Sequence, residues 1–145
     1  MFNIEYLYAI GSTSYGKTAA GILAGAVGVV ILVLFLNMIV LPADSMKFLP
    51  FIIAFNTAIT GYMVIDKTRD QFRHKRSVAI FAGAASVILA GACLNYLFLQ
   101  ATGLFLISLT DLFFMLIIGC VSSWLGGALA IKYLDLQREK QSVEL

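Results

Sequence analysis

Charged residues are scarce in this chain, and so are the residue types that carry most enzyme chemistry. Only 12% of its 145 residues are charged, and its single histidine, His74, lies in the basic stretch RHKR. The long apolar segments therefore contain no histidine pair for haem or a metal, and no base to activate a serine. One acid within those segments cannot form a catalytic dyad. We expect no metal, no cofactor and no catalysis.

Apolar residues, by contrast, dominate. Hydrophobic residues make up 61% of the chain, and the mean hydropathy is +0.94. A soluble protein this small could not keep so much apolar surface from water. About 20 helical residues cross a hydrocarbon core of about 30 Å. Four segments have the required length and composition: 19–41, 47–65, 78–99 and 104–131. They predict an all-α integral membrane protein with four transmembrane helices that form a single domain, 1–145.

Basic residues predict the orientation of these helices. Every Lys and Arg except Lys47 lies before the first segment, between the second and third, or after the fourth. Because Lys and Arg concentrate in cytoplasmic loops, we expect both termini in the cytoplasm, with a bacterial inner membrane as the default location. The expected parts are an interfacial segment 1–18, a hairpin 19–65, a basic cytoplasmic loop 66–77, a second hairpin 78–131 and a polar cytoplasmic tail 132–145.

An internal duplication is also indicated. Residues 23–41 align without a gap on residues 81–99, and the shared features include an AGA triplet and the pair Asn37 and Asn95. We interpret this as two helical hairpins in parallel orientation, although chance matching of apolar sequence is the alternative. In the same register Lys17 falls on Lys75, at the basic flank of a membrane helix.

This register bears on the stretch GSTSYGKT at 11–18, which satisfies the P-loop pattern G-x-x-x-x-G-K-[ST]. A P-loop follows a buried strand and precedes a helix that packs on a parallel sheet. Here the following segment is apolar on all sides and nothing remains to build a sheet. We interpret the match as coincidental and expect no nucleotide. The basic loop lacks any nucleic-acid-binding module, so we expect no nucleic acid either.

Small residues recur at four-residue spacing, which allows helices to approach closely in lipid. Two such rows in the fourth segment leave two alternatives: one face contacts another protomer, making a homo-oligomer, or both faces close the same four-helix bundle. The residues expected to pack helices together are Gly21, Gly25, Gly119, Ser123 and Gly127.

Four polar residues within the apolar segments form the candidate binding site. Asp111 is expected about 10 Å below the outer end of the fourth segment, where an ionised carboxylate costs about 3 kcal/mol unless it meets water or a partner. Asn37, Asn95 and Asn56 are expected in the same outer half. For Asp111, a cation, proton or headgroup site competes with an interfacial or capping role. For Asn37 and Asn95, helix packing competes with ligand contacts.

Two functions follow from these observations. The first is a small oligomeric transport protein, such as a flippase, carrier or channel-like unit, with a polar site in the outer leaflet. The second is a non-catalytic structural or assembly subunit of a larger membrane complex. The expected partners are membrane lipids and either a second copy or other membrane subunits. The topology resembles that of small multidrug exporters and small polyprenyl-sugar flippases, but the membrane Glu of the exporters' first helix is missing here.

Overall fold

The computed structural model describes residues 13–68 and 74–143, and the whole of this part of the chain is built on helices. All four are long and apolar enough to cross a membrane, which confirms the predicted all-α integral membrane class. Most of the expected interfacial segment 1–18 and the middle of the basic loop lie outside the described residues. The helices are α2 (Ser14–Ile39), α3 (Pro42–Thr68), α4 (Lys75–Thr102) and α5 (Leu109–Val143).

Local chemistry sets where these helices begin and end. Thr13 caps α2, because its Oγ1 accepts a hydrogen bond of 3.1 Å from the Gly16 N–H. Gly103 ends α4 with a left-handed φ of 74°, and its N–H donates to the Leu99 carbonyl at 2.9 Å. The chain then needs a connection before α5 begins at Leu109. The fourth helix therefore starts after the expected position 104.

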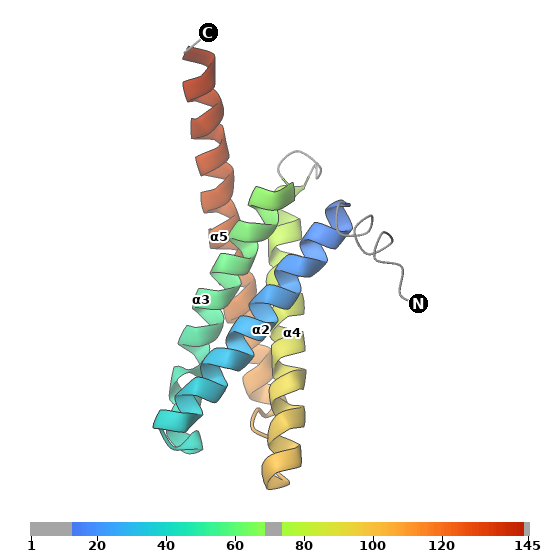
Figure 1. Ribbon diagram of the computed structural model, residues 1–145, viewed down its shortest axis with the longest axis vertical. Helices are drawn as coiled ribbons and strands as arrows, with labels where there is room; N and C mark the ends of the chain where they lie inside the picture. Colours follow the sequence, from blue (N-terminus) through green and yellow to red (C-terminus); the bar gives the residue numbers. More distant parts are fainter. Residues whose placement is uncertain (1–12, 69–73, 144–145) are drawn as a thin grey trace, which may run out of the picture.

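The other helix bounds also differ from those expected. The second helix begins at Pro42 rather than 47, because proline is well tolerated in a first helical turn. The polar tail from 132 onward is not separate from the last span, since α5 continues to Val143. At 35 residues, α5 is about 52 Å long. In Figure 1 its C-terminal part extends well beyond the ends of the other helices.

The helices run alternately up and down. The start of α2, the end of α3, the start of α4 and the C-terminal end of α5 all lie at one end of the bundle (Figure 1). Helices α3 and α4 contact each other and both remaining helices, whereas α2 and α5 do not pack together within the described residues. The start of α2 and the end of α5 thus share an end of the bundle with the helix ends that flank the basic loop. That this end faces the cytoplasm, and that the hairpins are repeats, stay predictions.

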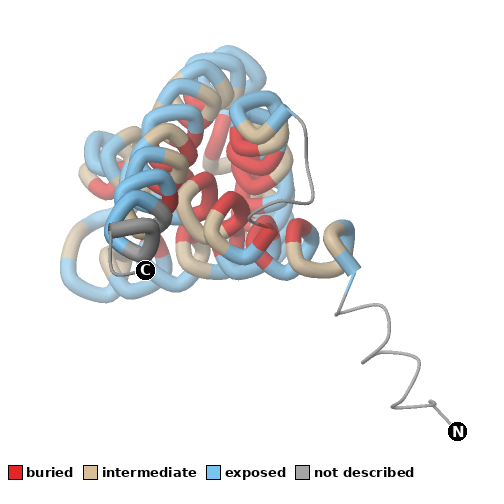
Figure 2. Tube along the Cα trace, turned by 90° about the horizontal axis from the view of Figure 1, so that it is seen from above, coloured by how far each residue is buried: buried red, intermediate tan, exposed pale blue. Residues whose placement is uncertain are grey.

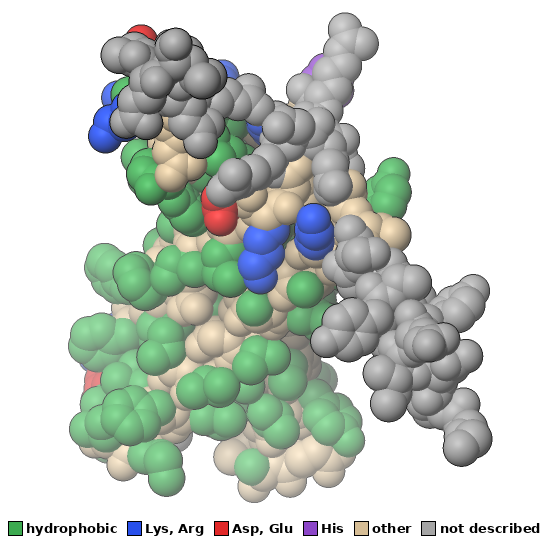
Figure 3. Space-filling model, turned by 45° about the horizontal axis from the view of Figure 1, so that its top comes forward, with side chains coloured by type: hydrophobic (Ala, Val, Ile, Leu, Met, Phe, Trp, Pro, Cys, Tyr) green, Lys and Arg blue, Asp and Glu red, His purple; other side chains and the backbone are tan. Residues whose placement is uncertain are grey.

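The outer surface of the bundle is apolar. Viewed from above, the buried residues line the inward faces of the helices, and the exposed ones lie outside (Figure 2). Large side chains such as Phe51, at 75% exposure, and Phe35, at 60%, point outward. On the face shown in Figure 3, Lys and Arg gather toward one end, and hydrophobic side chains cover most of the rest. A hydrocarbon environment satisfies such a surface, as expected for a membrane protein.

The helices also pack closely where α5 crosses α3 and α4. A Cβ on Gly61 of α3 or on Gly83 of α4 would collide with Ser123 of α5, and a Cβ on Gly126 of α5 would collide with the Ala58 carbonyl of α3. Both rows of small residues on α5 therefore pack against α3 and α4 inside the bundle. This arrangement matches the second of the two alternatives above, so the two rows give no argument for a homo-oligomer.

Replacement of Gly126 by alanine tests this close approach. Because the new methyl would collide with backbone rather than with a flexible side chain, we expect Gly126→Ala to lower the free energy of unfolding by about 2 kcal/mol. The measurement is unfolding of the purified protein in detergent. Ala92→Leu, on the exposed face of α4, is the control and should change little. A stabilising Gly126→Ala, as glycine-to-alanine normally is in an open helix, would contradict the packing.

Candidate functional site

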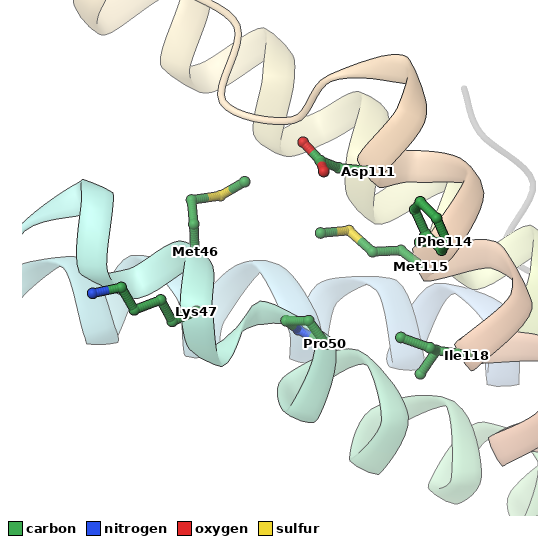
Figure 4. Close-up of a pocket in the computed structure, with 7 residues that line it drawn as sticks. All are labelled: Met46, Lys47, Pro50, Asp111, Phe114, Met115 and Ile118. Carbon is green, nitrogen blue, oxygen red and sulfur yellow. The ribbon is translucent and has the colours of Figure 1, made fainter.

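A cavity of about 320 Å³ lies between the first turns of α3 and those of α5. Figure 4 shows Met46, Lys47 and Pro50 on the α3 side and Asp111, Phe114, Met115 and Ile118 on the α5 side. In this view the side chains of Met46 and Met115 point toward one another across the gap, and the Asp111 carboxylate extends from α5 toward the same gap. The lining is therefore mainly apolar with one carboxylate at its edge.

Asp111 belongs to the first turn of α5. The Ser108 hydroxyl donates to Asp111 Oδ2 at 2.7 Å, and the Asp111 N–H donates back to Ser108 Oγ at 3.1 Å. The side chain is exposed. Because α5 starts only at Leu109, Asp111 lies in the first turn of the helix and not seven helical residues in, as a start at 104 would have it. Its depth in the membrane stays a prediction. A negative charge in a first turn also interacts favourably with the helix dipole.

Lys47 is a member of this site that sequence reasoning missed. It is the one basic side chain among the described residues that line the cavity, so Asp111 does have a basic residue nearby. Its ammonium group, however, is 2.7 Å from Asp44 Oδ1 and points away from the gap in Figure 4. Both partners of this ion pair are largely exposed, so the pair contributes little to stability.

Pro50 is the second missed member, although a proline within an apolar segment was a usable signal. It lies inside α3. Proline has no N–H, so it cannot donate to the carbonyl of the residue four positions earlier, which is Met46. The cavity therefore contains the side chains of both residues of an interrupted helical hydrogen bond.

Asn37 joins the first two helices. Its Nδ2 donates to the Val33 carbonyl at 2.9 Å, and its Oδ1 accepts from the Ser45 hydroxyl of α3 at 2.8 Å. The amide thereby ties the end of α2 to the start of α3. These bonds fit the packing alternative; ligand binding by Asn37 stays a prediction.

Asn95 holds the connection between α4 and α5. Its Nδ2 donates to the Ile107 carbonyl at 3.0 Å, and its Oδ1 accepts from the Ile107 N–H at 2.8 Å. Ile107 is buried, so without this amide both of its backbone groups would need other partners. Each of the two aligned asparagines thus fastens its own helix to the segment that follows.

Asn56 lies deeper, where α2, α3 and α4 meet. Its Nδ2 donates to the Ile52 carbonyl at 3.1 Å, and its Oδ1 lies against Gly28 of α2. The hydroxyl of Thr60 donates to the Asn56 carbonyl at 2.8 Å, so α3 satisfies its own polar groups. Of the four predicted ligand residues, only Asp111 is among the described residues that line the cavity.

Helices α2, α3 and α4 are in close contact one turn from Asn56. A Cβ on Gly25 would collide with Thr60 Oγ1 and lie 2.9 Å from Ser86 Oγ. Ser86 is fully buried, and its hydroxyl has no hydrogen-bond partner among the described residues. This junction is therefore a packed helix contact.

The residues expected to pack helices together all lie at such contacts. Ser123 also adds a hydrogen bond, since its hydroxyl donates to the Ala79 carbonyl of α4 at 2.6 Å. The four glycines are buried and face neighbouring helices: Gly21 faces Val64, Gly25 faces Thr60 and Ser86, Gly119 faces Val87, and Gly127 faces Ala79.

The P-loop-like stretch is helical where it is described. Since α2 begins at Ser14, Gly16 and Lys17 lie within its first turn, and the Thr18 hydroxyl donates to the Ser14 carbonyl at 2.9 Å. A phosphate-binding loop would instead wrap the backbone N–H groups of these positions around the anion. The absence of a nucleotide partner stays a prediction.

Other chemistry finds little support in this part of the chain. Cys93 and Cys120 are free thiols. Among residues 13–68 and 74–143, no group of three or more His, Cys, Asp or Glu is placed to hold a metal. Comparison with protein-family models, with curated protein sequences and with solved structures yields no match.

The structural role of Asn95 can be tested by substitution. We expect Asn95→Leu to lower the free energy of unfolding by about 2 kcal/mol, because the Ile107 N–H and carbonyl lose their partner. Hydrogen exchange should rise at 103–108 before it rises elsewhere. The exposed neighbour provides the control variant, Tyr96→Leu. Equal exchange in the two variants would contradict this role.

Proposed function

We propose that this is a small, non-enzymatic membrane transport protein whose binding site is the cavity between α3 and α5. The observation that carries the proposal is the cavity itself, which combines an exposed carboxylate with an apolar lining at the rim of a membrane-spanning bundle. Such a combination suits a molecule with a polar head and an apolar body. A transported amphiphile, such as a lipid or a hydrophobic metabolite, has this form.

The position of the cavity favours transport at the bundle's surface over conduction through its centre. Near mid-bundle, Gly25, Thr60 and Ser86 are in close contact, and Gly61 and Gly83 leave no gap around Ser123. A central water-filled channel would have to separate these helices. A molecule held between α3 and α5 can instead remain partly in the lipid.

Native mass spectrometry of the protein extracted gently from its own membrane tests the proposal. We expect the wild-type chain to retain a small non-covalent ligand, and Asp111→Asn to lose it while the protein keeps its assembly and stability. The variant preserves a side-chain oxygen that can accept from Ser108, so the start of α5 should form normally. Asp135→Asn, an exposed acid toward the other end of α5 and outside the cavity lining, is the matched control.

A different result of the same measurement would contradict the transport proposal. If neither protein carries a small molecule, and a different polypeptide is released in stoichiometric amount, the transport proposal fails. The chain is then a subunit of a larger complex.

One observation favours that second function. Beyond Leu134, which packs with Ile65 and Ala79, α5 leaves the bundle (Figure 1). Its exposed residues Leu129, Tyr133 and Leu136 recur at helical spacing and form one apolar stripe that runs onto the projecting part. An apolar stripe outside the bundle is the form in which helices dock with partners.

Leu136→Ser tests the subunit alternative. The residue is 50% exposed, so the substitution should leave unfolding of the isolated chain unchanged. If α5 docks a partner, co-purification of that polypeptide should fall by about tenfold, which corresponds to about 1.4 kcal/mol. Gln137→Ser is the adjacent control. Undiminished co-purification, or the lack of any partner in the wild type, speaks against docking through this stripe.

A further inference from the structure

We infer that the cavity between α3 and α5 binds a positively charged head group, an organic ammonium carried on an apolar body. The inference rests on the proposed function, since it names the ligand class of that site. Its basis is the balance of hydrogen-bond acceptors, polarisable groups and charge around the cavity. Two sources share this chemistry: an aminophospholipid of the membrane and a free hydrophobic amine.

The Asp111 carboxylate retains capacity for such a head group. A carboxylate has two oxygens with about four acceptor positions, and Ser108 occupies one of them through Oδ2. The Asp111 backbone N–H is already bonded to Ser108 Oγ, so the turn is fixed without the rest of the carboxylate. The charged group is thus held in place and can accept further bonds from a cation.

The remaining lining also suits a cation. Phe114 presents an aromatic ring, and organic cations bind favourably to aromatic faces. Met46 and Met115 contribute polarisable thioethers that adapt to an apolar body of varied shape.

The charged groups around the cavity disfavour an anionic ligand and favour a cationic one. Lys47 is the only basic group that the described lining offers, and Asp44 already holds its ammonium at 2.7 Å. In Figure 4 the Lys47 side chain points away from the gap that Asp111 borders. The side chains of Asp111, Asp44 and Lys47 together carry one net negative charge. An anionic head group would meet Asp111 with no unpaired basic group opposite.

The size of the cavity fits a head group with only part of its tail. About 320 Å³ is at the lower end of the range for small-molecule sites, about 300–1,000 Å³. The outer surface beside it is lipid-facing, with Phe51 at 75% and Phe114 at 61% exposure. A longer chain can therefore lie along α3 and α5 in the bilayer while the ammonium group remains at Asp111.

The test is equilibrium binding of radiolabelled decyltrimethylammonium to the purified chain in micelles of a nonionic maltoside detergent, which carries no ammonium group. Binding to protein-free micelles is subtracted, and unlabelled decylsulfonate serves as the anionic competitor of equal tail length. We expect decyltrimethylammonium to bind at a saturable site that decylsulfonate does not compete for. Asp111→Asn should weaken the affinity by about tenfold or more, which corresponds to about 1.4 kcal/mol.

Two further variants separate binding from folding. Asp135→Asn removes an exposed acid toward the other end of α5 and should leave the affinity unchanged, and Ser108→Ala removes the hydroxyl that bonds to the Asp111 N–H while keeping the Asp111 carboxylate. We expect Ser108→Ala to lower stability but to retain most of the binding. The inference is overturned if decylsulfonate competes as well as unlabelled decyltrimethylammonium, if Asp111→Asn binds like the wild type, or if Ser108→Ala abolishes binding while the protein remains folded.

Native mass spectrometry distinguishes the two sources. Retained phosphatidylethanolamine that decyltrimethylammonium displaces identifies a lipid head group, whereas a retained small amine without phospholipid identifies a free ligand; each supports the inference. Failure of the proposed transport function can be told apart from failure of the ammonium inference, because the first is measured as ligand flux across the membrane and the second as ligand binding. Asp111-dependent binding without flux in proteoliposomes removes transport and leaves the site, whereas a retained ligand that lacks an ammonium group removes the ammonium inference alone.

Discussion

The close approach of α5 to α3 and α4 at Ser123 is the contact on which the rest of the structure depends. Lipid offers little hydrophobic force between helices, so their association relies on packing and on interhelical hydrogen bonds. Here Gly61 and Gly83 allow two helices to approach Ser123, whose hydroxyl bonds to Ala79 across the interface. Because α5 sits this close, its small rows are buried and its large apolar side chains face outward. The lipid-exposed surface is a consequence of that contact.

Tight packing at mid-bundle also decides where a ligand can bind. The small residues leave no space around Gly25, Thr60 and Ser86, and Ser86 loses a hydrogen bond to this packing. Toward the start of α5 the larger side chains of Met115, Phe114 and Ile118 take the place of the small residues. They line the cavity opposite the part of α3 that contains Pro50. The cavity lies there, at the edge of the bundle. A polar site at a rim fits a ligand that stays partly in the lipid, as the transport proposal requires.

The polar side chains that the structure describes mostly bond within short stretches of chain, many of them to backbone carbonyls of their own helix. Asn37 fastens α2 to the start of α3, and Asn95 fastens α4 to the connection before α5. Thr57, Thr60 and Thr68 donate to carbonyls of their own helix. Such bonds leave few polar groups available for a ligand. Asp111 differs because the bonds to Ser108 fix it without exhausting its acceptors, which is why the proposed site centres on this residue.

The sequence by itself determined the fold class and the four apolar spans of the described residues, because the bilayer requires about 20 apolar residues per span whatever the tertiary contacts are. It also identified the packing residues, since small side chains at four-residue spacing make a close contact wherever the helices meet. It did not determine the helix ends around 103–108, where one left-handed glycine and one serine cap shift the start of α5 and bring Asp111 to the surface. Nor did it pair Asp111 with Met46, Lys47 and Pro50, which are distant in the chain. Only the crossing of α3 and α5 brings them to one cavity, because that geometry follows from which small residues face each other in space.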